Sequence, residues 1–438
     1  MIKAFAASTF GPDTTGPEPD KLKIAIIGGG ICGLALAAGL CKISSLEVHV
    51  YEAVSKYKAL HLNAIKAMAS IGPEVRQAYF NKATNMGEEE EEMVTQVILA
   101  QGPHMGELVA ELGRAKGRKS VSRADLLAGL LELVPKRCIT FNKKLRYLEE
   151  AQHHSGVLLE FEDGTYTEAD CVLGADGIRS MVRKYVLGAE HPAATPKNHD
   201  QWQVYRTLVT VEEARKFINE RWTRNVPILL GPKGHVNCIP LNKGTRLSAG
   251  VAVKGAALAD GGDTKPLDPD LYKDYSEDAQ QIVRLVARDT SASWSVGDHD
   301  HAPRYHKGRV AVVGDAAHAS LPFAGNGAAQ ALEDAAVLNH IFREMARMEP
   351  FLEELALTGE QRIVAVLAAY DSVRRPRSQA VVDLARKFGR IYAFAEDGLH
   401  DDPQRMKEFF ASAASFTNDV DVEQQNKDAI AAFWSYIE

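Results

Sequence analysis

The chain has 438 residues, and at roughly 150 residues per domain this length predicts two or three domains. Hydrophobic residues make up 45% and charged residues 25% of it, so the chain can bury a sizeable core without disulfide or metal staples. The 51 basic and 58 acidic residues give a net charge of −7. Because no basic excess is available to neutralise phosphates, this composition argues against a nucleic-acid-binding protein.

The cysteines and the first residues indicate an intracellular protein. Five scattered cysteines, an odd number, do not make a disulfide framework, so we expect buried thiols in a reducing, cytoplasmic setting. Residues 1–21 contain no apolar segment long enough for a signal peptide and are typical of a flexible leader. Residues 24–41 are nearly uncharged, but three successive glycines interrupt them. Since glycine triplets break helices, we predict a strand, a turn and a helix here, and no membrane span.

The first chemical signal is a glycine-rich turn after this strand. Residues 23–27 predict a buried parallel strand, Gly28, Gly30 and Gly33 follow in GxGxxG spacing, and residues 34–40 predict a helix. In such a motif the first glycine permits the tight turn, the second lets a pyrophosphate approach, and the third packs helix on strand. The N-terminus of the helix attracts the phosphates.

A second strand completes this arrangement. Residues 47–51 predict the strand, and Glu52 at its end is placed to accept hydrogen bonds from ribose hydroxyls. The order of strand, turn, helix, strand and acid therefore predicts dinucleotide binding. It does not by itself separate NAD from FAD.

Two more apolar strands run into acidic turns. Residues 171–174 lead into Asp176 and Gly177, and residues 309–313 lead into Gly314 and Asp315. In this order the three motifs resemble the flavoprotein monooxygenases of the aromatic-hydroxylase, salicylate hydroxylase-like, family over residues 23–377. The resemblance implies an α/β fold in which an FAD-binding dinucleotide (Rossmann-like) domain is interleaved with a β-sheet substrate domain and followed by a helical C-terminal tail.

The resemblance also assigns roles to these motifs. It implies that the glycine turn binds the ADP half of FAD, that Asp176 and Gly177 serve both FAD and passage of the nicotinamide cofactor, and that Asp315 holds the flavin ribityl chain. Arg123 stands in an Arg-x-x-Leu pattern in which the family's arginine contacts FAD. A solvated charge in the first turn of a helix is the alternative for Arg123.

The residues after Asp315 support these roles independently. Gly325 and Gly327 open a predicted helix whose N–H groups can face the N1–C2=O edge of the flavin, with Ala328 as the expected backbone donor. Reduced flavin carries negative charge at that edge, which a positive helix end stabilises.

One segment departs from the family. A Gly-Ala-Gly loop usually precedes a Leu-x-x-Asn-Ala helix start, and here residues 60–64 match that start while residues 57–59 contain no glycine. Either a true deletion or an omitted mobile loop accounts for the difference. The loop lies near the isoalloxazine ring in the family.

The domain organisation follows from these motifs. Four β-rich runs predict the substrate-domain sheet: residues 204–211, 226–230, 236–240 and 247–253. The expected ranges are a flexible leader (1–21), the first part of the FAD-binding domain (22–184), a mainly substrate-binding sheet domain (185–300), the second part of the FAD-binding domain (301–350) and a helical C-terminal region (351–438).

The C-terminal region shows apolar residues at helical spacing. Residues 363–370 and 378–394 predict helices, with a basic cluster at a proline break over residues 374–377. Residues 429–437 predict an apolar tail docked on the body or on a partner subunit.

Two residues are candidates for contact with an aromatic substrate. Arg206, on a predicted substrate-domain strand, can bind a carboxylate or stabilise a phenolate. His235 stands where relatives often carry a histidine near the substrate, and its unperturbed pKa near 6.5 suits a base. A surface arginine and a structural histidine are the alternatives. No pattern with metal-ligand spacing is evident, so we expect no metal site.

The resemblance implies an FAD-dependent monooxygenase that uses NADH or NADPH as transient co-substrate. Oxygen would add at flavin C4a, and the hydroperoxyflavin would hydroxylate a phenolic or salicylate-like ring. A hydroxylase of phenolic polyketides, a flavin oxidase or dehydrogenase without oxygen transfer, and a non-catalytic escort protein on the same fold are the alternatives. The expected partners are a small aromatic molecule and O₂, and the expected state is a monomer or homodimer.

Overall fold

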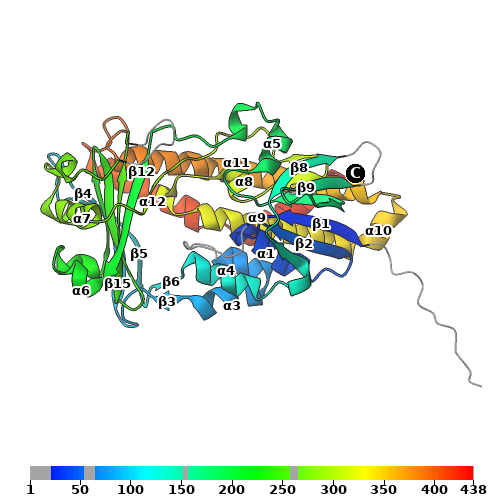
Figure 1. The fold of residues 1–438 in the computed structure, drawn as a ribbon, viewed down its shortest axis with the longest axis horizontal. Coiled ribbons are helices and arrows are strands. Elements are labelled where there is room, and N and C mark those ends of the chain that lie inside the picture. The colour runs from blue at the N-terminus through cyan, green and yellow to red at the C-terminus, as the bar shows by residue number, and fades with distance from the viewer. Residues whose placement is uncertain (1–20, 54–64, 151–155, 257–264, 438) are drawn as a thin grey trace, which may run out of the picture.

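The computed structural model describes residues 21–53, 65–150, 156–256 and 265–437. Nearly all of the predicted leader and the glycine-lacking segment before Leu60 lie outside the described residues. Two separate sheets occupy the two halves of the molecule, and long helices run between them (Figure 1).

A six-stranded sheet forms one half. Its order is β17-β18-β11-β1-β2-β7, and every neighbouring pair is parallel except β17 with β18. The strands are β1 (Leu22–Ile27), β2 (Leu46–Glu52), β7 (Ile139–Phe141), β11 (Cys171–Gly174), β17 (His306–Lys307) and β18 (Val310–Val312). The central strands are apolar and buried on both faces, which is typical of a parallel sheet covered on both sides. The predicted dinucleotide-binding fold is therefore confirmed.

Helices and a small sheet surround these strands. Helix α1 (Ile31–Leu40) packs against α9 (Gly327–Arg347), and an antiparallel sheet is formed by β8 (Leu145–Glu150), β9 (Val157–Phe161) and β10 (Tyr166–Ala169). The remaining elements of this half are α2 (Ile65–Ile71), α3 (Pro73–Lys82), α4 (Arg123–Leu131), α5 (Met181–Leu187), α8 (Asp315–His318), α10 (Glu349–Glu354), β3 (Thr84–Asn85) and β6 (Lys119–Ser120).

A seven-stranded sheet forms the other half, in the order β16-β12-β15-β14-β13-β4-β5. Its members are β4 (Glu92–Leu99), β5 (Leu108–Lys116), β12 (Gln203–Thr210), β13 (Val226–Gly231), β14 (Gly234–Leu241), β15 (Arg246–Val253) and β16 (Ser293–Ser295). The four strands predicted from β-rich runs are confirmed as β12 to β15. Strands β4 and β5 come from within the range 22–184, so we propose that the substrate unit also includes residues 92–116.

Helix α7 (Glu277–Ala287) covers one face of this sheet because its apolar residues share one side. Ala279, Ile282, Val283 and Val286 follow the i, i+3, i+4, i+7 spacing, and all are buried. They pack on the inward-facing residues of β12, β14 and β15. The opposite face of the sheet is therefore the one that looks toward the FAD-binding half. The short helix α6 (Val211–Ala214) follows β12.

The C-terminal helices join the two halves. Helix α11 (Gly359–Tyr392) extends from the six-stranded sheet to the seven-stranded sheet (Figure 1). The predicted break near Pro376 is wrong, because α11 continues through that residue. A proline inside a helix costs about 3 kcal/mol, but here Arg374, Arg375 and Arg377 on both sides of it form ion pairs that hold the helix in place.

Two further helices end the chain, α12 (Pro403–Asn418) and α13 (Val422–Ser435). Helix α13 packs on α9 and α11, and Phe433 is fully buried, so the predicted docking of an apolar tail on the body is confirmed. In the parts of the chain that the structure describes, no helix is both long and apolar enough to cross a membrane.

Candidate active site

The predicted cofactor residues meet at one edge of the six-stranded sheet. The sheet order β18-β11-β1-β2 places Asp315, Asp176, Gly28 and Glu52 at or just after the carboxyl ends of four neighbouring parallel strands. Ligands of open α/β sheets bind at this edge. Segments that lie far apart in the sequence are thus brought together, as the three ordered motifs predict.

The glycine turn has the geometry that its spacing predicts. Gly28 has a φ of +103°, and a Cβ there would lie 2.3 Å from the carbonyl oxygen of Ala175. A Cβ on Gly33 would lie 2.0 Å from the carbonyl oxygen of Gly28, so only glycine lets α1 pack this closely on the turn. At Gly30 the nearest atom is a guanidinium nitrogen of Arg123, at 3.7 Å. A cation and an uncapped helix start therefore face the same space, which suits a pyrophosphate.

The carboxylate of Glu52 is hydrogen-bonded to the glycine turn. It accepts a hydrogen bond from the backbone N–H of Gly29 at 2.5 Å, and Glu52 is only 8% exposed. The bond fixes the acid beside the glycine motif, where a ribose would lie. Its contact with ribose hydroxyls stays a prediction.

Asp176 has a local partner that the sequence motif does not reveal. Its carboxylate accepts hydrogen bonds from the side chain of Ser180 and from the N–H groups of Met181 and Val182, so it caps α5. Burial raises the pKa of Asp176, and these hydrogen bonds oppose that effect. Gly177 follows with a φ of +77° and open space at its Cβ position. The roles of both residues toward FAD and the nicotinamide stay predictions.

Asp315 begins α8 at the end of β18, with its side chain exposed at the carboxyl edge. The long helix α9 starts nearby, after Gly325 in the left-handed conformation at a φ of +61°. No side chain caps α9, and its first turn carries no acid. The N–H groups of Gly327 and Ala328 therefore remain available to a ligand, as expected for a helix end that faces the flavin.

These features fit FAD. The two uncapped helix starts, the close approach permitted at Gly30, the Arg123 guanidinium and the exposed Asp315 supply the donors and acceptors that a flavin dinucleotide requires. FAD bound there would carry the electron-transfer and oxygen chemistry. Within the described ranges, no group of three or more His, Cys, Asp or Glu side chains is arranged to hold a metal ion.

The two candidate substrate residues lie on one face of the seven-stranded sheet. Arg206 on β12 pairs in register with Gly250 on β15, which pairs with Asn237 on β14. His235 lies two residues before Asn237, so Arg206 and His235 are about 12 Å apart at their Cα atoms by strand geometry. Gly250 separates Arg206 from Asn237 in this register, and the side-chain oxygen of Asn237 lies 3.0 Å from the position that a Cβ on Gly250 would take.

The guanidinium of Arg206 is oriented by the sheet. Its Nε donates to the hydroxyl of Ser248 at 2.7 Å, and the residue is half-buried. Burial lowers the pKa of Arg206 below its ordinary value. Asn237 and Ser248 were missed by sequence reasoning. The period of two along β14 and β15 is the signal that places them on the same face as His235 and Gly250.

His235 lies where the seven-stranded sheet meets the loop before α9. Its ring packs against Phe323 with centroids 5.2 Å apart and against Tyr392 at 4.9 Å. Phe323 belongs to the turn just before Gly325, so His235 touches the loop that leads into α9. Burial lowers the pKa of His235 to about 4, and its Nδ1 has no hydrogen-bond partner among the described residues. At neutral pH the ring is therefore uncharged, and it is a weaker base than the unperturbed pKa near 6.5 predicts.

The lowered pKa predicts a specific pH dependence. Between about pH 6.5 and 4 the unfolded chain protonates this histidine and the folded chain does not, so stability falls as the pH falls through that window. From pH 7 to pH 4 the unfolding free energy of the wild type is expected to decrease. In His235→Gln this decrease is expected to be smaller by about 3 kcal/mol. Urea unfolding of both proteins across this range measures the difference. Parallel stability curves for wild type and variant would contradict the burial of His235.

The class of protein is defined by this arrangement: an FAD-binding α/β domain whose flavin edge faces a cation-bearing face of a second sheet. The chain belongs to the FAD-binding monooxygenases of the aromatic-hydroxylase family. A family model described as an FAD binding domain matches residues 21–385. The chain is 34% identical over 434 residues to the 6-methylsalicylate 1-monooxygenase of Aspergillus terreus, covering 96% of this chain and 94% of that protein.

Two further relatives agree. A salicylate hydroxylase of Pseudomonas putida is 30% identical over 414 residues, which are 89% of this chain and 90% of that protein. The solved structure of a salicylate hydroxylase substrate complex has a TM-score of 0.78 and 28% identity, and the match covers 94% of this chain and 98% of that one. The predicted family, fold class and enzyme class are therefore confirmed.

Proposed function

We propose that this FAD-dependent monooxygenase hydroxylates a salicylate-like or phenolic ring, with NADH or NADPH as reductant and O₂ as the oxygen source. The observation that carries the proposal is the contact between His235 and Phe323, which joins the substrate face of the seven-stranded sheet to the loop entering α9. The relatives named for salicylate and 6-methylsalicylate support an aromatic acid as substrate.

The residues divide the work between them. Arg206, fixed by Ser248, would bind the carboxylate of the substrate or stabilise its phenolate. His235, neutral and buried, would accept a hydrogen bond from the phenolic hydroxyl of the substrate. Asn237 lies two residues from His235 on β14 and across β15 from Arg206, and it can donate to or accept from a ring substituent. The apolar rings of Phe323 and Tyr392 exclude water beside His235.

Two measurements test this function. Purified protein reconstituted with FAD is expected to be yellow and to oxidise NADH or NADPH at least about tenfold faster with the correct aromatic acid or phenol than without it. A panel of salicylates, benzoates and phenols, each run with both nicotinamides, identifies the substrate and the reductant.

The second measurement uses ¹⁸O₂. A monooxygenase places one labelled oxygen atom in the product, whereas an oxidase or dehydrogenase leaves the product unlabelled. Stimulated NAD(P)H oxidation that yields only hydrogen peroxide across the whole panel would contradict hydroxylation of these substrates. Protein that cannot be reconstituted with FAD would contradict the proposal altogether.

A further inference from the structure

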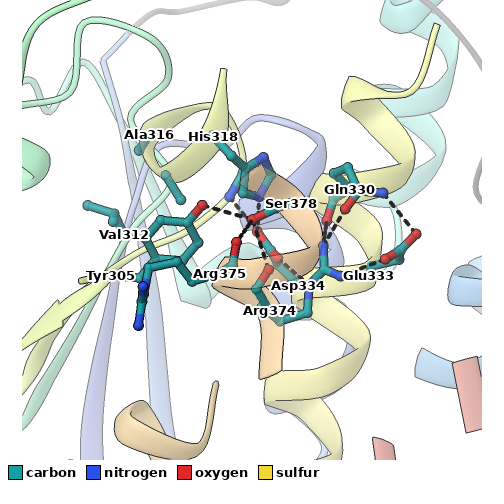
Figure 2. Close-up of polar contacts among 12 residues, drawn as sticks. Tyr305, Val312, Ala316, His318, Gln330, Glu333, Asp334, Arg374, Arg375 and Ser378 are labelled. Carbon is teal, nitrogen blue, oxygen red and sulfur yellow. Dashed lines mark hydrogen bonds and ion pairs between the residues drawn. The ribbon is translucent and has the colours of Figure 1, made fainter. Parts of the chain in front are cut away.

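A buried charged cluster lies directly beneath the turn that carries Asp315. At its centre, the carboxylate of Asp334 on α9 accepts three hydrogen bonds (Figure 2). The donors are the backbone N–H of Gly314 at 2.8 Å, the Nε2 of His318 at 2.6 Å and the Nε of Arg374 at 2.7 Å. The Asp334 side chain is 0% exposed.

The first two donors stand at the two ends of one short segment. Gly314 has a φ of +58° and precedes α8, while His318 is the last residue of α8. One carboxylate therefore ties both ends of the four-residue helix that begins with Asp315. From the other side, the guanidinium of Arg183 on α5 donates to the carbonyl oxygens of Ala316 and Ala317 at 3.0 and 2.5 Å.

The third donor links the turn to the C-terminal helices. Arg374 on α11 is fully buried and also donates to the carboxylate of Glu333 at 2.6 Å and to the side chain of Gln425 on α13 at 2.8 Å. Burial alone would raise the pKa of Asp334, but its interactions with His318 and Arg374 lower it to about 2. The carboxylate is thus ionised throughout the neutral range.

Such a cluster is costly to maintain. Burying ionised groups costs several kcal/mol each, and well-packed apolar residues often give equal or greater stability. A fully satisfied buried network does fix geometry, because each member accepts or donates in one arrangement only. The atoms fixed here are those of the turn that presents Asp315, at the edge where FAD binds.

We propose that Asp334 is a positioning residue for FAD, which shapes the Gly314–His318 turn for the ribityl chain, and that Arg374 makes helices α11 and α13 part of the same binding machinery. Asp334 itself is buried behind the turn and acts through Gly314 and His318. This inference rests on the proposed binding of FAD at the turn. It does not depend on the identity of the substrate.

The substitution Asp334→Asn tests the proposal on the full chain. It keeps the size of the side chain but removes the negative charge that orders His318 and Arg374. The dissociation constant of FAD, measured by fluorescence quenching on apoprotein, is expected to rise at least about tenfold. The visible spectrum of flavin bound to the variant is expected to shift, because the turn no longer presents the same groups to it.

A matched control separates positioning from stability. Glu150 on β8 also accepts from a backbone N–H and an arginine side chain, those of Arg309, at 2.9 and 3.0 Å, but at the opposite end of β18. Glu150→Gln should lower the urea midpoint of the apoprotein and leave FAD affinity within about twofold of wild type. FAD affinity that is unchanged in Asp334→Asn, or equally weakened in Glu150→Gln, would overturn the proposal.

If Asp334→Asn does not fold, a second pair of variants tests the positioning role of Asp334. His318→Gln retains a donor for Asp334, and His318→Leu does not. FAD affinity is expected to fall in His318→Leu and to be largely restored in His318→Gln, whereas equal affinities in the two would overturn the proposal. Wild-type protein that binds no FAD would instead refute the proposed function, so the two failures are distinguishable.

Discussion

Replacing Arg206 with alanine is expected to lower kcat/KM for an aromatic acid by about 100-fold, equivalent to about 2.7 kcal/mol of lost transition-state stabilisation. The reason is that the guanidinium is half-buried and pre-oriented by Ser248, so it can form charge-assisted hydrogen bonds to a carboxylate or phenolate at little entropic cost. The dissociation constant of FAD is expected to stay within about twofold, because Arg206 lies on the other sheet. Steady-state kinetics and FAD titration measure the two quantities.

Two further variants sharpen this result. Arg206→Lys keeps the charge and loses the planar fork, so it is expected to recover only part of the activity. Arg284→Ala removes an exposed arginine from α7, on the opposite face of the same sheet, and is expected to leave kcat/KM within about twofold. If Arg206→Ala changes turnover no more than Arg284→Ala does, Arg206 has no part in the site.

Replacing Gly33 with alanine is expected to weaken FAD binding by about 100-fold or more and to lower the stability of the apoprotein. The added methyl carbon would lie 2.0 Å from the carbonyl oxygen of Gly28, which is backbone and cannot turn aside. Helix α1 must then move away from the turn, and overpacking of this kind typically costs about 1–3 kcal/mol. The displaced helix also carries the N–H groups that face the pyrophosphate.

The same helix supplies the control for this experiment. A methyl carbon on Gly39 would instead meet the side-chain amide of Asn339 at 1.8 Å, where α1 packs on α9 away from the turn. Gly39→Ala is therefore expected to lower the unfolding midpoint while the folded fraction still binds FAD with near-normal affinity. Thermal unfolding and FAD titration of both variants separate the effects. Equal loss of FAD affinity in both would show that close packing of α1, and not the turn, is decisive.

The parts of the fold that the sequence predicted correctly are those that local patterns encode. The glycine turn, the strand before it and the helix after it follow from neighbouring residues, and so do the strands β12 to β15. The family resemblance then placed three such local motifs at one sheet edge. The position of β4 and β5 was not predicted, because strand pairing across more than 100 residues leaves no local signal.

The features that sequence reasoning missed are non-local pairings. In the sequence Arg374 belongs to a basic cluster beside a proline. In the structure it is fully buried and forms ion pairs with Glu333 and Asp334 on α9. In the sequence Asp334 is one polar residue of a predicted helix, and no neighbouring residue indicates its hydrogen bond with Gly314. Asn237 lacks a motif altogether, and only the strand register places it across β15 from Arg206.

The sheet edge that gathers Gly28, Asp176 and Asp315 has a consequence for how the protein is made. Gly28 is synthesised about 300 residues before β18 and the start of α9. The contacts that form the site therefore join residues far apart in the sequence, which means a high contact order. Arg374 and Gln425, which complete the cluster behind the turn, are later still. The edge cannot be completed before Arg374 and Gln425 are made, so the flavin joins the polypeptide only after these residues have been synthesised.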